Sequence, residues 1–247
     1  MSTTMLSAFR QFDEDSVAVH SWLNSITNDM RLISFVEMEY LRLRYWDEHD
    51  TFAVSVNKSW TLHAVPQTLQ RFKTTLPSPQ PTFAFGYRPS ACPEHSSGLF
   101  GVVEQELAWP VVTVEVATTK QTPEETSMRC IYAGVLMLAN LAALRRRAGR
   151  SPAYGQMQVF TIAMDKSLIR IIDHWIEKDN GHDKYLWKVV ASWPGVMSNI
   201  EESGRIVRDL IKQALDQMLS KIKDDLSAAD ETRHLEADAE QPVVGRP

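Results

Sequence analysis

Hydrophobic and polar residues alternate through much of the middle of the chain, and this two-residue period predicts a β-sheet. β-branched and aromatic residues are frequent in these segments, as is typical of strands. Strands are expected at residues 51–56, 82–87, 111–118, 157–164, 167–177 and 185–193. Asn180-Gly181 is a hairpin signal between the last two segments. The last three strands are therefore expected to form a meander.

A period of three to four residues predicts helices before, within and after these strands. Two helices are expected near the N-terminus, the second at about residues 31–47. A third starts where Thr122 is the N-cap, Pro123 takes the first helical position and Glu125 closes a capping box. It ends at a run of arginines, with Gly149 as the stop. The last helix is amphipathic and spans about residues 198–223.

This pattern predicts one domain of the α/β (α+β) class, with a central mixed β-sheet flanked by helices and an N-terminal helical extension. Residues 1–14 have weak periodicity and are expected to be a flexible arm. The domain then covers residues 15–223, with a helical part at 15–80 and the sheet core at 81–223. Residues 224–247 are acidic and poor in large apolar side chains, which predicts a disordered tail.

Charge and composition narrow the choice of partner and compartment. The net charge of −5 comes from the last 24 residues, and the rest of the chain is neutral, which disfavours duplex binding unless a local basic patch exists. The arginines at 145–150 suit the helix dipole, or else bind phosphate or a partner. Two cysteines form no disulfide framework. Because no secretory signal or long apolar run is evident, we expect an intracellular protein of cytoplasm or nucleus, away from membranes.

Glu115 is the most informative residue, because it lies in the middle of a β-branched run. A buried carboxylate is costly unless it is paired or bound to metal. Glu115 therefore faces solvent on an edge strand, pairs with an arginine, or belongs to a site. Thr113 shares its face of the strand. Trp109, with other tryptophans near in sequence, could line an apolar pocket.

Several segments together resemble a known family. They are PTFAFGY, PVVTVEVATTK, SMRCIYAGVLMLANLAAL, QVFTIAM, the strands around IIDHWIE and KYLWKVV, and the closing amphipathic helix. Over about residues 60–223 the chain resembles the fungal PD-(D/E)XK nuclease-like proteins, a branch of the restriction-endonuclease-like superfamily. The resemblance implies a restriction-endonuclease-like core in which two acids and a lysine converge at one edge of the sheet. The acids hold a divalent cation, usually Mg²⁺, that activates water.

The chain departs from that motif at two of its three positions. Thr82 stands where the first acid is expected, Glu115 is the second acid, and Ala117 stands where the lysine is expected. Lys120, five residues past Glu115, could reach in from the turn. A helix position that is often glutamine in the family falls at Arg129. The candidate catalytic residues are thus Glu115, Lys120 and Thr82, and the candidate binding residues are Thr113, Arg129 and Trp109. No metal site is expected, and Glu115 is the ligand if there is one.

Three functions fit this incomplete motif. The first is a degenerate nuclease-like protein, a pseudoenzyme that binds a protein or nucleic-acid partner without catalysis and needs no cofactor. The second is a nuclease-like scaffold reused as an enzyme on a small organic molecule, for example in a biosynthetic pathway. The third is an active nuclease with a migrated site, which alone would require Mg²⁺. Thr82 and Ala117 favour the first two, and the motif does not choose between a protein and a small-molecule ligand.

Overall fold

The computed structural model describes residues 33, 36, 51–60, 78–92, 107–118, 121–165, 168–194 and 200–239. The expected N-terminal arm lies outside these residues. So do the expected N-terminal helices, apart from Ile33 and Val36, which are helical. Val36 is fully buried in the main hydrophobic core.

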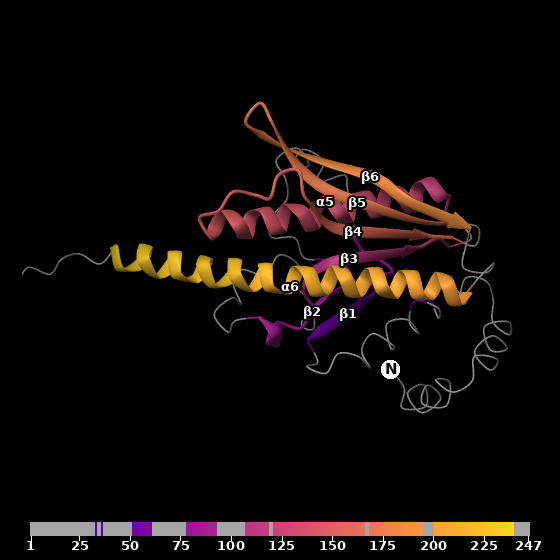
Figure 1. The fold of residues 1–247 in the computed structure, drawn as a ribbon, viewed down its shortest axis with the longest axis horizontal. Helices are drawn as coiled ribbons and strands as arrows, with labels where there is room; N and C mark the ends of the chain where they lie inside the picture. Colours follow the sequence, from indigo (N-terminus) through magenta and orange to yellow (C-terminus); the bar gives the residue numbers. More distant parts are fainter. Residues whose placement is uncertain are drawn as a thin grey trace, which may run out of the picture.

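Six strands form one mixed sheet, in the spatial order β1-β2-β3-β4-β5-β6 (Figure 1). Only β3 and β4 pair in parallel, and every other neighbouring pair is antiparallel. The predicted α/β class with a central mixed sheet is therefore confirmed, and β4, β5 and β6 form the expected meander. The strand bounds are Phe52–Val56, Phe83–Tyr87, Ala108–Val116, Met157–Met164, Leu168–Asp179 and His182–Pro194.

Helix α5 (Pro123–Arg147) connects the two parallel strands, a connection that requires a crossover. Its start is as predicted: the Thr122 hydroxyl accepts the Glu125 N–H, and the Glu125 carboxylate accepts the Thr122 N–H. Gly149 follows its end with a left-handed φ of 67°. α5 is long and apolar enough to span a membrane, but 67% of its most apolar window is buried, as is typical of a core helix.

The two long helices pack on opposite faces of the sheet. The face that carries Glu115 contacts Arg129 of α5. On the other face, the Tyr87 hydroxyl donates to the Leu215 carbonyl of α6 (Ile200–Ala239) over 2.5 Å. Strand β2 was expected to be half-buried, but every residue in it is buried because both faces are covered. This three-layer packing places the Glu115 side of the sheet under α5.

Helix α6 extends 16 residues beyond its expected end at Lys223. The disordered tail predicted from residue 224 is therefore wrong for residues 224–239, while residues 240–247 lie outside the described part. Asp225 explains the difference, because its buried carboxylate pairs with Arg145 and Arg150 at the end of α5. Leu226 and Ala229 are also buried, so acidic composition alone gave the wrong boundary.

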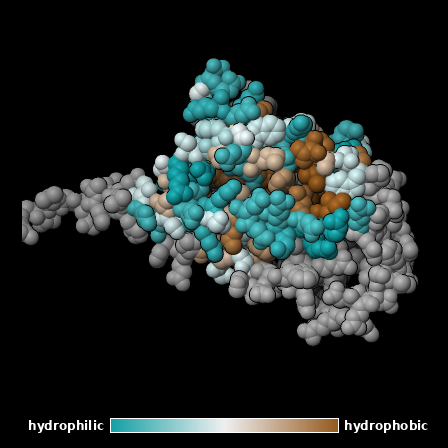
Figure 2. All heavy atoms as spheres, viewed as in Figure 1, coloured by the Kyte–Doolittle hydropathy of each residue, from teal (hydrophilic) through white to brown (hydrophobic). Residues whose placement is uncertain are grey.

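The hairpin between β5 and β6 projects from the body, and its tip is hydrophilic (Figures 1 and 2). Asn180 and Gly181 form its turn with positive φ values of 49° and 84°, as the sequence predicts. Further along β6, which is an edge strand, the surface is more hydrophobic (Figure 2), and Trp187, Val189 and Val190 are exposed there.

Candidate functional site

Glu115 lies near the end of the central strand β3 and is only 3% exposed. The neighbouring strand β2 brings Thr82 beside it. The Thr82 hydroxyl donates to Glu115 Oε2 over 3.3 Å and accepts the N–H of Val116 over 3.1 Å. The two positions that the nuclease resemblance treats as paired acids are therefore in direct contact, but one of them is a neutral hydroxyl.

Arg129, in the second turn of α5, approaches the other oxygen of the carboxylate. Its Nε lies 3.8 Å from Glu115 Oε1, and its terminal nitrogen donates to the Gln80 carbonyl over 3.0 Å. The arginine side chain is 43% exposed, whereas the Glu115 side chain is buried. Of the three arrangements open to Glu115 from the sequence, an edge-strand position facing solvent is wrong, and an ion pair with an arginine is observed.

Burial raises the pKa of Glu115 to about 7, although Arg129 and the hydrogen bonds from Thr82 act in the opposite direction. The carboxyl group is thus a mixture of protonated and ionised forms near neutral pH. Such a pKa suits proton transfer, but a general acid or base must also reach its substrate.

Cys130 is the next residue along α5 after Arg129 and is fully buried. Burial, and then the nearby Glu115 carboxylate, raise the pKa of its thiol far above the ordinary value. A thiol that stays protonated is a weak nucleophile. Cys130 therefore fills space beside the ion pair, and we assign it no catalytic role.

A second polar group lies under α5, further along the sheet. Thr161 Oγ1 and His174 Nε2 are 2.9 Å apart, and both residues are fully buried. Burial lowers the pKa of His174 to about 4, which keeps its ring neutral at pH 7. Within the part of the chain that the structure describes, His174 Nδ1 and the Thr113 hydroxyl have no hydrogen-bond partner. Thr113 pairs with Thr161 in the β3–β4 ladder, so it belongs to this group more than to the Glu115 pair.

The structure brings together three of the six predicted site residues: Glu115, Thr82 and Arg129. Trp109 lies six residues before Glu115 on β3, about 20 Å away by strand rise. It is buried in the core with a left-handed φ of 47°, and its indole N–H has no partner among the described residues. It does not line the cavity of about 470 Å³ that the described residues form. Lys120 lies outside the described residues.

Sequence reasoning did not single out His174. Its signal was weak, because a lone histidine in an apolar strand gives no spacing to recognise. Strand parity does place it on the face of Ile172 and so under α5. Its ring packs against Gly134 of α5, a helical glycine that no turn or cap requires, and a Cβ added there would lie 2.3–2.5 Å from the ring.

The region that carries this geometry matches a known family. The family is described as a domain of unknown function, DUF7924, and its match spans residues 24–226. The chain belongs to the DUF7924 family. No curated protein and no solved structure matches it. The DUF7924 match includes all six strands, α5, and α6 as far as Leu226, so it includes Glu115, Thr82 and Arg129.

The donor set around Glu115 does not fit a magnesium site. Mg²⁺ prefers several oxygen ligands, which usually include one or two protein carboxylates. Here a single carboxylate has a hydroxyl on one side and a guanidinium cation on the other. Within the described part of the DUF7924 domain, no group of three or more histidine, cysteine, aspartate or glutamate side chains could hold a metal ion.

Replacing Glu115 by glutamine should make stability less sensitive to pH. In the wild type the folded pKa of about 7 lies above the ordinary 4.5. The folded state therefore holds a proton that the unfolded state releases, and stability falls as pH rises from 4.5 to about 7. Between pH 4.5 and 8 the wild type should therefore lose about 3 kcal/mol of its free energy of unfolding through Glu115, and Glu115→Gln should not lose it. The stability of the variant relative to the wild type should rise by that amount.

Urea denaturation of both proteins at pH 4.5 and pH 8 measures this gain. His174 and Asp173, whose pKa values are also shifted by burial, titrate in both proteins, so their contributions cancel in the difference. A difference between variant and wild type that stays constant across this range would contradict the burial of an ionisable carboxyl at Glu115.

Proposed function

We propose that this DUF7924 protein is a degenerate PD-(D/E)XK nuclease-like protein, which acts as a binding module and lacks metal-dependent nuclease activity. One observation carries the proposal. Both oxygens of the Glu115 carboxylate are approached by groups of the protein itself, the Thr82 hydroxyl at 3.3 Å and the Arg129 guanidinium at 3.8 Å. A cation that belongs to the chain itself thus pairs with the one acid that the motif retains.

The order of elements supports the resemblance on which this proposal rests. Strands β2 and β3 bring the two motif positions into contact, α5 follows directly, and β4 returns in parallel beside β3. Ala117, where the motif has lysine, carries no functional group. This arrangement supports the proposal of a nuclease-like frame in which Thr82 and Ala117 replace two of the three motif side chains.

The two alternatives have less support. An enzyme acting on a small organic molecule needs an apolar pocket beside Glu115. The cavity that we describe below is polar and lies near the other end of α5, about 26 Å away by helix rise from Arg129 to Arg146. A nuclease with a migrated site needs further acids close to Glu115, and the described residues bring an arginine there instead.

Incubation with nucleic acid tests the proposal. Supercoiled plasmid, single-stranded DNA and RNA would be incubated with the full chain in Mg²⁺ or Mn²⁺. We expect the wild type to cleave these substrates no more than Glu115→Gln does. This variant is the control, because glutamine has the shape of glutamate but cannot ionise. Metal-dependent cleavage by the wild type that disappears in Glu115→Gln would overturn the proposal and favour an active nuclease.

A further inference from the structure

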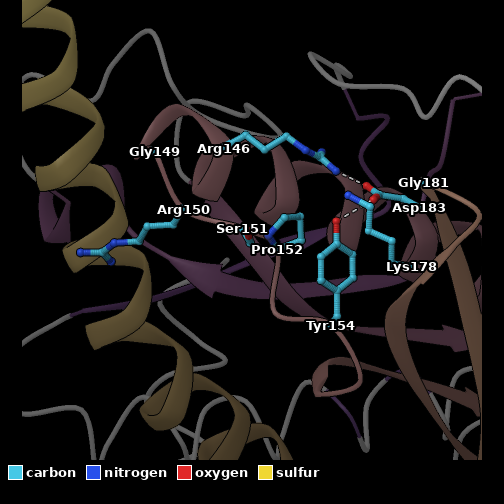
Figure 3. A pocket seen from close by; sticks show the side chains of 9 residues that line it. All are labelled: Arg146, Gly149, Arg150, Ser151, Pro152, Tyr154, Lys178, Gly181 and Asp183. Atoms are coloured by element: carbon cyan, nitrogen blue, oxygen red, sulfur yellow. Dashed lines mark hydrogen bonds and ion pairs between the residues drawn. The ribbon is translucent and has the colours of Figure 1, made fainter.

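A polar cavity of about 470 Å³ lies where the C-terminal end of α5 meets the β5–β6 hairpin (Figure 3). We call it the basic cleft, and its lining includes Arg146, Ser151, Tyr154, Lys178, Gly181 and Asp183. Its volume falls within the range of about 300–1,000 Å³ that is usual for small-ligand sites. It is separate from the Glu115 pair.

The basic cleft is positively charged in a chain whose net charge is −5. Three of the residues that line it, Arg146, Arg150 and Lys178, are basic, and one, Asp183, is acidic. The dipole of α5 accounts for basic residues in its last turn. It does not account for Lys178, which comes from the hairpin and faces the same cavity.

The carboxylates near the basic cleft already have partners. Asp183 accepts from the Arg146 guanidinium and, over 3.0 Å, from the Tyr154 hydroxyl. Asp225 of α6 pairs with Arg150, whose guanidinium points away from the cavity centre (Figure 3). Asp183 therefore orients Arg146 and Tyr154 toward the cavity, with both of its oxygens occupied.

Lys178 is the basic residue of the cleft that is not held in an ion pair within the described residues, although Asp183 lies opposite it in the β5–β6 register. Its ammonium lies 5.6 Å from the centre of the Tyr154 ring. Arg146 is 47% exposed, so part of its guanidinium remains open to a ligand. Gly149 and Gly181, both with positive φ, leave open space where a side chain would otherwise stand.

We propose that the basic cleft binds the phosphate group of a small phosphate monoester, with Arg146 and Lys178 as its polar contacts. A phosphate monoester carries a charge of about −1.5 to −2 at pH 7 and three acceptor oxygens. The planar guanidinium can donate two hydrogen bonds to such a group, and the ammonium supplies a point charge. This inference rests on the proposed function, because it takes the chain to be a binding module and names the chemistry of its ligand.

Calorimetric titration of the full chain with phenyl phosphate and with inorganic phosphate tests the basic cleft, at constant ionic strength set with chloride. We expect saturable binding that Lys178→Gln weakens about tenfold, the loss that one charge-assisted contact gives. Lys184→Gln is the matched control, because this lysine lies on the same hairpin, is 58% exposed and does not line the cavity. It should bind like the wild type.

Three results would overturn the inference. They are no saturable binding, equal weakening by Lys178→Gln and Lys184→Gln, and tighter binding of a DNA or RNA oligonucleotide that depends on Lys178. The last result would make the cleft a nucleic-acid surface instead. Nuclease activity that persists in Lys178→Gln would refute the proposed function without bearing on the cleft, so the two failures are distinguishable.

Discussion

Replacing Gly134 by alanine should lower the free energy of unfolding by about 3 kcal/mol or more, the upper range for an overpacked core. A Cβ at this position would lie 2.3–2.5 Å from three atoms of the His174 ring. The ring cannot move aside easily, because it is fully buried and contacts Thr161 over 2.9 Å. In an exposed helix the same change would stabilise by about 1 kcal/mol, so the expected sign is opposite to helix propensity.

Urea denaturation followed by circular dichroism measures the effect. Gly149→Ala is a useful control, because nothing lies within 4 Å of the added Cβ and only its left-handed φ is strained, at a cost of about 1 kcal/mol. A double-mutant cycle assigns the cause: in a His174→Ala background, Gly134→Ala should cost little or should stabilise. An equal cost in both backgrounds would show that the ring is not the obstacle.

The sheet and the start of α5 could be predicted from the sequence because their signals are local. Alternating β-branched residues place the strands, and Thr122, Pro123 and Glu125 fix the first turn of the helix. The Asn180-Gly181 turn is local in the same sense. Each of these signals lies within a few residues, so no knowledge of the packing was needed.

The features that depend on distant residues were missed or only partly predicted. The ion pairs of Asp225 with Arg145 and Arg150 join residues 75 to 80 positions apart, and these extend α6 where composition predicted disorder. The contact of Gly134 with His174 spans two layers and leaves no pattern in either element. Arg129 was singled out only by resemblance, and its contact with Glu115 depends on where α5 packs on the sheet.

An aspartate at Thr82, where the nuclease resemblance expects an acid, should create a metal response if the proposed function is right. In Thr82→Asp a second carboxylate would stand about where the hydroxyl now lies, 3.3 Å from Glu115 Oε2. Two carboxylates this close repel each other, so in EDTA at pH 8 the variant should be less stable than the wild type by about 2–4 kcal/mol. Mg²⁺ at about 100 times its dissociation constant should restore about 2.7 kcal/mol.

The decisive measurement is the thermal unfolding of wild type, Thr82→Asp and Thr82→Asn, each in EDTA and in Mg²⁺. Thr82→Asn is the matched control, because asparagine has the shape of aspartate without its charge. If Glu115 belongs to a nuclease-like frame that lacks its second acid, Mg²⁺ should raise the Tm of Thr82→Asp alone. A Mg²⁺ shift in the wild type as large as in Thr82→Asp would contradict the loss of the metal site, and no shift in any of the three would contradict the nuclease-like frame.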